Sequence, residues 1–73
     1  MAKMMILRGA VNEHTDSRVL AIALESCVGY WEVVCLGSSP QLFQNITGAK
    51  LWLNSIGKLL CSHYKVFSGV YRE

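Results

Sequence analysis

The sequence has few charged residues, a single proline and no long hydrophobic run, and each shortage excludes a class of protein. Only 16% of its 73 residues are charged and 52% are hydrophobic, a balance that disordered chains lack. One proline and six glycines exclude a collagen-like or linker chain. The longest aliphatic run, 19–24, is far shorter than the roughly 20 residues of a membrane-spanning helix. We therefore expect one small domain, residues 1–73, without a membrane segment.

Cysteine is also scarce. Cys27, Cys35 and Cys61 are odd in number, which argues against a disulfide framework. The apolar stretch 4–7 is too short for the core of a secretory signal before Arg8 interrupts it. We expect free thiols and a cytoplasmic location.

No motif for catalysis or for cofactor binding is present, and the glycines are too dispersed for a phosphate loop. Cys61 and His63 could supply only two ligands, whereas zinc needs about four converging N or S atoms. We expect Cys27 and Cys35 to be small core residues and His63 to end a helix. The chain is predicted to be no enzyme and to hold no metal and no cofactor.

Hydrophobic periodicity predicts strands over 4–11, 30–36 and 64–71. It predicts an amphipathic helix from Gly48 to Cys61 or Ser62, with Thr47 as its N-cap. The apolar face of this helix is expected to carry Ala49, Trp52, Leu53, Ile56, Leu59 and Leu60, and the polar face Lys50, Asn54, Gly57 and Lys58.

Residues 18–26 fit two structures. Their alternating large and small side chains favour a strand, whereas their alanines and leucines suit a helix ending at Gly29. The favoured fold is α+β, a small antiparallel sheet in the order β-β-β-α-β with the long helix packed on one face. The alternative is β-α-β-α-β.

A single helix leaves the other face of a sheet uncovered. In the favoured fold we expect that face to carry Val19, Ala21 and Ala23 with several aromatic and methionine side chains, and so to bind a second copy or a partner. The expected partner-binding residues are aromatic, as in interface hot spots: Tyr30, Trp31, Phe67 and Tyr71. Glu32 is interpreted as an edge-strand charge, for which Arg8 is the candidate ion-pair partner.

These features favour a non-catalytic protein-binding module, a homodimer that regulates or inhibits a larger complex. Short chains without motifs are common among accessory proteins of phages and other mobile elements, which modestly favours an inhibitor. A second hypothesis is a nucleic-acid accessory protein, although a net charge of +2 is too small to indicate one. Its phosphate contacts would be Lys50, Lys58, Lys65 and Arg72. A third is a small-ligand binder whose dimer cleft meets an anion through Arg8, His14 or Arg18.

Overall fold

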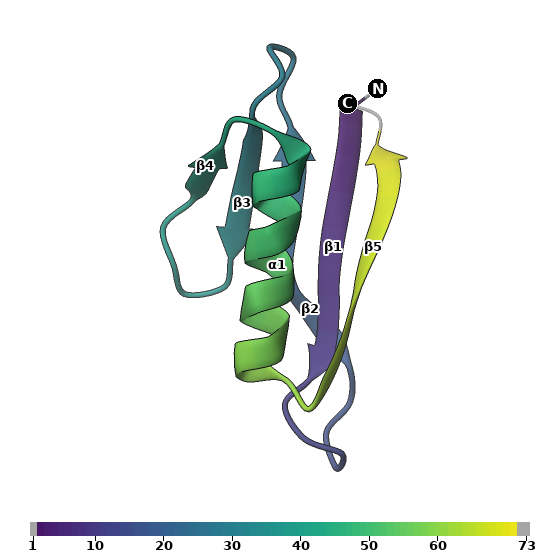
Figure 1. Ribbon diagram of the computed structural model, residues 1–73. Helices are drawn as coiled ribbons and strands as arrows, with labels where there is room; N and C mark the ends of the chain where they lie inside the picture. Colours follow the sequence, from purple (N-terminus) through teal and green to yellow (C-terminus); the bar gives the residue numbers. More distant parts are fainter. Residues whose placement is uncertain (1, 72–73) are drawn as a thin grey trace.

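The computed structural model describes residues 2–71, which form five strands and one helix. The strands make one antiparallel sheet in the order β4-β3-β2-β1-β5, and α1 lies across one face of it (Figure 1). This confirms the predicted α+β class, and the alternative with a helix at residues 18–26 is wrong. The elements are β1 (Ala2–Ala10), β2 (Arg18–Glu25), β3 (Trp31–Cys35), β4 (Gln41–Phe43), α1 (Ile46–Leu60) and β5 (His63–Tyr71).

The short strand β4 is absent from the predicted order. Its three residues follow Pro40 and are too few to show an alternating pattern. β4 pairs with β3, Trp31 opposite Phe43, and the Phe43 ring lies 6.1 Å from the ring of Trp52 on α1. Because β4 covers the outer edge of β3, the interpretation of Glu32 as an edge-strand charge is wrong.

The helix begins two residues earlier than predicted, and its N-cap is Asn45 rather than Thr47. The side-chain oxygen of Asn45 accepts a hydrogen bond from the backbone N–H of Gly48 at 2.9 Å. That bond satisfies one of the N–H groups that the first helical turn leaves without a partner. Thr47 lies inside the helix and is exposed. Within residues 2–71 no helix has the length and apolar character needed to cross a bilayer.

The hydrophobic core lies between α1 and the near face of the sheet. Apart from Leu20, which lies at an irregularity in the β1–β2 register, alternate residues of three strands meet the helix there, because successive side chains of a strand point to opposite faces. The core residues on strands β1 to β3 are Met5, Leu7, Leu20, Ala21, Ala23, Trp31 and Val33, and on α1 they are Ala49 and Leu53.

The assignment of β2 residues to the uncovered face is therefore wrong for two of the three. Ala21 and Ala23 are 2% and 0% exposed on the helix side. Alternation separates the two sets of side chains but does not say which set lies under the helix. The alanine side chains are smaller than those on the other face of β2, and this lets α1 pack closely against the sheet. Val19 lies on the uncovered side, paired with Arg8 beyond an irregularity in the β1–β2 register.

The buried face of α1 is rotated from the predicted one. Gly57 is buried there, while Leu59 is 77% and Leu60 46% exposed, so the predicted placement of these three residues is wrong. The reason is the chain after the helix: β5 returns along the sheet and places Tyr64 against Gly57. Ala49 and Leu53 are buried as predicted, and Trp52 and Ile56 are partly buried against the core.

Candidate binding surface

The sheet side without the helix is a continuous apolar surface, here called the open face. Its central row crosses four strands, because Ile6 pairs with both Phe67 and Ile22, and Ile22 pairs with Val34. Val34 and Phe67 are each 44% exposed. A second row, Met4–Leu24–Glu32–Leu42, runs beside it. The apolar residues of the open face are Met4, Ile6, Val19, Ile22, Leu24, Val34, Leu42 and Phe67.

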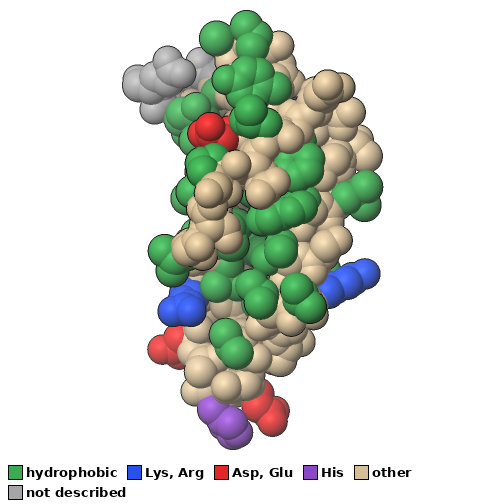
Figure 2. Space-filling model, turned by 90° about the vertical axis from the view of Figure 1, so that its left-hand side faces the viewer, with side chains coloured by type: hydrophobic (Ala, Val, Ile, Leu, Met, Phe, Trp, Pro, Cys, Tyr) green, Lys and Arg blue, Asp and Glu red, His purple; other side chains and the backbone are tan. Residues whose placement is uncertain are grey.

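Surface hydrophobicity extends beyond the sheet face to the β4 edge. Figure 2 views the molecule from the β4 side and shows hydrophobic side chains over much of that surface, with few charged ones among them. Leu36, just after β3, is 81% exposed, and Leu42 on β4 is 66% exposed. Contiguous apolar surface of this kind marks interaction sites in proteins.

Two charges of opposite sign lie at diagonal ends of the open face. Arg8 follows Ile6 by two residues on β1, and Glu32 precedes Val34 by two residues on β3. β1 and β3 both run antiparallel to β2, so they run parallel to each other. Arg8 and Glu32 are therefore placed symmetrically about Ile22, on strands that β2 separates. The predicted ion pair between them within one chain is wrong.

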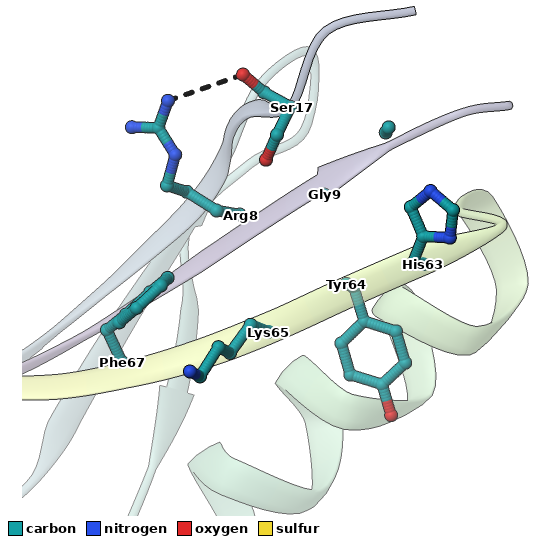
Figure 3. Close-up of a pocket in the computed structure, with 8 residues that line it drawn as sticks. Arg8, Gly9, Ser17, His63, Tyr64, Lys65 and Phe67 are labelled. Carbon is teal, nitrogen blue, oxygen red and sulfur yellow. Dashed lines mark hydrogen bonds between the residues drawn. The ribbon is translucent and has the colours of Figure 1, made fainter. Parts of the chain in front are cut away.

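A basic cavity of about 300 Å³ lies at the Arg8 end of the open face (Figure 3). Arg8 and Lys65 are directly opposite each other on β1 and β5. The Arg8 guanidinium donates a hydrogen bond to the carbonyl oxygen of Ser17 at 3.3 Å. The Lys65 ammonium lies 5.3 Å from the centre of the Phe67 ring. The cavity is lined by Arg8, Gly9, Ala10, Ser17, His63, Tyr64, Lys65 and Phe67.

The four aromatic residues predicted to bind a partner do not form one cluster. Phe67 and Tyr71 lie on the open side of β5. Tyr30 is 42% exposed in the turn before β3 and lines a small cavity together with Tyr71 and Glu32. Trp31 is 2% exposed and contributes to the core, so its prediction as a contact residue is wrong. The reason is alternation along β3: Glu32 lies on the open face, so the adjacent Trp31 points to the opposite face, under the helix.

The predicted basic stripe is not continuous. Lys50 and Lys58 are exposed on α1, whereas Lys65 lies on the open face of the sheet, away from the helix. Arg72 lies outside the described residues. The structure therefore groups Lys65 with Arg8 rather than with the helical lysines.

The cysteines and histidines are dispersed. All three cysteines are free, but Cys27 is exposed in the β2–β3 turn rather than buried. Cys35 and Cys61 pack partly against the core. His63 begins β5 instead of ending the helix. Over residues 2–71 no three His, Cys, Asp or Glu residues gather as a possible metal site.

Of the residues suggested for an anion site, Arg8 is the one that lines the basic cavity. His14 lies in the exposed β1–β2 loop, and Arg18 lines a separate cavity that also contains Asp16. Sequence reasoning missed the contribution of Lys65 and Ser17 to the Arg8 cavity. The alternation over 64–71 puts Lys65 and Phe67 on one face, but their position beside Arg8 depends on pairing between the first and last strands.

Comparison with known proteins adds no relative: no family model, curated protein or solved structure matches the chain.

Proposed function

We propose that the protein is a non-catalytic binding domain that acts through protein contact, and that its open face takes a second copy of the same chain. The observation that carries this proposal is the central apolar row Phe67–Ile6–Ile22–Val34, which no element of residues 2–71 covers. Exposed contiguous apolar surface is costly in water and is relieved by association.

Charge complementarity supports a second copy as the occupant. A two-fold axis through Ile22, in the plane of contact and perpendicular to the Arg8–Glu32 diagonal, places Arg8 of each copy over the partner's Glu32. The same operation brings Ile22 over the partner's Ile22. Two-fold dimers use one patch on both subunits, so a self-complementary patch is what such a dimer needs. Sheets stack in this way about 10 Å apart with interdigitating side chains.

In this proposal the dimer is the form that regulates or inhibits a larger complex. The helix side of the molecule, including the exposed Leu51 on α1, stays free in the dimer for such a contact.

Charge reversal tests the dimer. We expect the wild-type chain to show concentration-dependent dimerisation by analytical ultracentrifugation. Arg8→Glu and Glu32→Arg should each raise the dimer dissociation constant by more than about tenfold, because like charges then face each other across the contact. The double variant R8E/E32R should restore the wild-type constant. A chain that is monomeric at every concentration, or a double variant no better than the singles, contradicts the proposal.

A further inference from the structure

We infer that the basic cavity formed by β1, β5 and the end of the β1–β2 loop binds the phosphate group of a small molecule. This goes beyond the proposed function and does not depend on it. The volume of about 300 Å³ lies at the lower end of the range for small-ligand sites. Backbone and side chains from both ends of the described chain build the cavity, since β1 and β5 are neighbours in the sheet.

The first argument is a pair of like charges with no acidic residue in the cavity lining. Arg8 and Lys65 are direct cross-strand partners on one face of the sheet. Like charges directly opposite each other destabilise a sheet. None of the eight residues that line the cavity is acidic, so the lining itself supplies no counter-charge. An anion between the two side chains turns this repulsion into two attractions.

The second argument is the orientation of Arg8. Its hydrogen bond to the Ser17 carbonyl holds the guanidinium on the β2 side of the cavity (Figure 3). Arginine carries five N–H donors in a planar fork that matches phosphate oxygens, and this bond uses only one of them. The ammonium of Lys65 adds a second cation from β5. Two cationic groups suit a doubly charged phosphate better than a carboxylate.

The surroundings favour a small phosphorylated molecule over a nucleic acid. The other lysines of the predicted stripe, Lys50 and Lys58, lie on α1 across the sheet, so the basic residues do not form a track for a phosphate backbone. Phe67 lines the cavity beside the two cations and is 44% exposed. Its ring gives an apolar or aromatic part of the same ligand a surface to contact.

Titration of the ¹⁵N-labelled chain by NMR tests this site. The probes are inorganic phosphate and phenyl phosphate, added at constant ionic strength set with chloride. We expect saturable shifts centred on the backbone amides of Gly9, Ser17 and Lys65, and tighter binding of phenyl phosphate than of phosphate. Arg8→Gln and Lys65→Gln should each weaken binding by about tenfold or more, because each removes a charge-assisted hydrogen bond.

The control variant is Lys58→Gln, which removes one positive charge from the exposed side of α1. It should bind both probes as the wild type does. Shifts that stay linear with concentration, or equal losses in Lys58→Gln and Lys65→Gln, overturn the proposal. A short single-stranded oligonucleotide is the further arm. If it binds with a salt dependence that reports several phosphate contacts while phenyl phosphate does not bind, the ligand is nucleic acid and the inference is wrong.

These outcomes are distinct from those of the dimer test. Phosphate binding is read from amide shifts, and dimerisation from sedimentation. A monomeric chain that binds phosphate at Arg8 and Lys65 contradicts the proposed function and supports this inference.

Discussion

The ring of Tyr64 lies against the backbone of Gly57, in the space that a side chain at position 57 would occupy. A Cβ atom built on Gly57 comes within 3.0 Å of several atoms of that ring. Gly9 of β1 pairs with Tyr64, and a Cβ there would come within 2.7 Å of Cys61 Sγ and 3.0 Å of the Tyr64 Cβ. Gly57 therefore makes room for the Tyr64 ring, and Gly9 makes room for Cys61 and the backbone side of Tyr64, at the junction of α1 and β5.

Gly57→Ala should destabilise the protein even though alanine is the better helix former. Helix propensity alone favours the substitution by about 1 kcal/mol. The methyl group must displace the Tyr64 ring, and overpacking of a core costs about 1–3 kcal/mol. We expect a net loss of about 1 kcal/mol in the free energy of unfolding, measured by urea denaturation. In a Tyr64→Ala background the same change should be stabilising. Equal effects in both backgrounds would show that the ring is not the cause.

This junction also shows how far the sequence predicts the fold. Periodicity identifies β3, β5 and most of α1 because each has enough residues to show its repeat. It places Gly57 on the polar face because glycine has no side chain to indicate burial. The contact with Tyr64 depends on where β5 returns, which is a property of the whole sheet. For the same reason, the position of Lys65 beside Arg8 was beyond a residue-by-residue reading.

The face covered by the helix was the other feature that the sequence left open. Large side chains at Ile22 and Leu24 and small ones at Ala21 and Ala23 form two clear sets. The larger set looks like the core when hydrophobic area alone is counted. The helix instead lies over the smaller set, because two alanines leave space for Leu53 and Trp31 between the layers. The large apolar residues are thereby left on the open face.

The cap of α1 can be tested by two matched alanine substitutions. Asn45→Ala removes the acceptor of the Gly48 N–H and should lower the free energy of unfolding by about 1 kcal/mol. Thr47→Ala changes an exposed residue inside the helix and should alter stability by no more than about 0.5 kcal/mol in either direction. Thermal denaturation followed by circular dichroism measures both. If Thr47→Ala lowers the free energy of unfolding more than Asn45→Ala does, Thr47 is the N-cap, as the sequence predicted.

Adjacent aromatic residues at the start of β3 should respond very differently to truncation. Trp31→Ala opens a cavity beneath α1 and should cost about 3–5 kcal/mol, a large part of the total stability of a small domain. Tyr30→Ala should cost no more than about 0.5 kcal/mol, because the side chain is half exposed in a turn. Chemical denaturation of the two variants gives the comparison. A mild effect of Trp31→Ala would place its ring outside the core.

A lysine in the central row of the open face should prevent dimerisation without unfolding the chain. At Val34, which is 44% exposed, the lysine ammonium can reach water in the monomer but is buried in the proposed dimer. We expect Val34→Lys to raise the dimer dissociation constant by more than about tenfold. Leu59→Lys is the matched control, since Leu59 is 77% exposed on α1. If both variants dimerise equally, the contact lies elsewhere on the surface.

Phosphate should shift the equilibrium from dimer to monomer if both proposals hold. In the dimer Arg8 faces the partner's Glu32, and in the basic cavity it faces the ligand. Glu32 and phosphate therefore compete for the same guanidinium. Binding linkage is reciprocal: if phosphate raises the dimer dissociation constant, dimerisation must weaken phosphate binding at the Arg8 site of each copy. Sedimentation with phosphate against chloride at equal ionic strength measures the effect of phosphate on the dimer dissociation constant.

The Lys65→Gln variant is the control. It has a weakened anion site and an intact Arg8, so its dimerisation should be much less sensitive to phosphate. A phosphate effect as large in Lys65→Gln as in the wild type would mean that the anion acts elsewhere, because competition at Arg8 requires occupancy of the cavity that Lys65 helps to form.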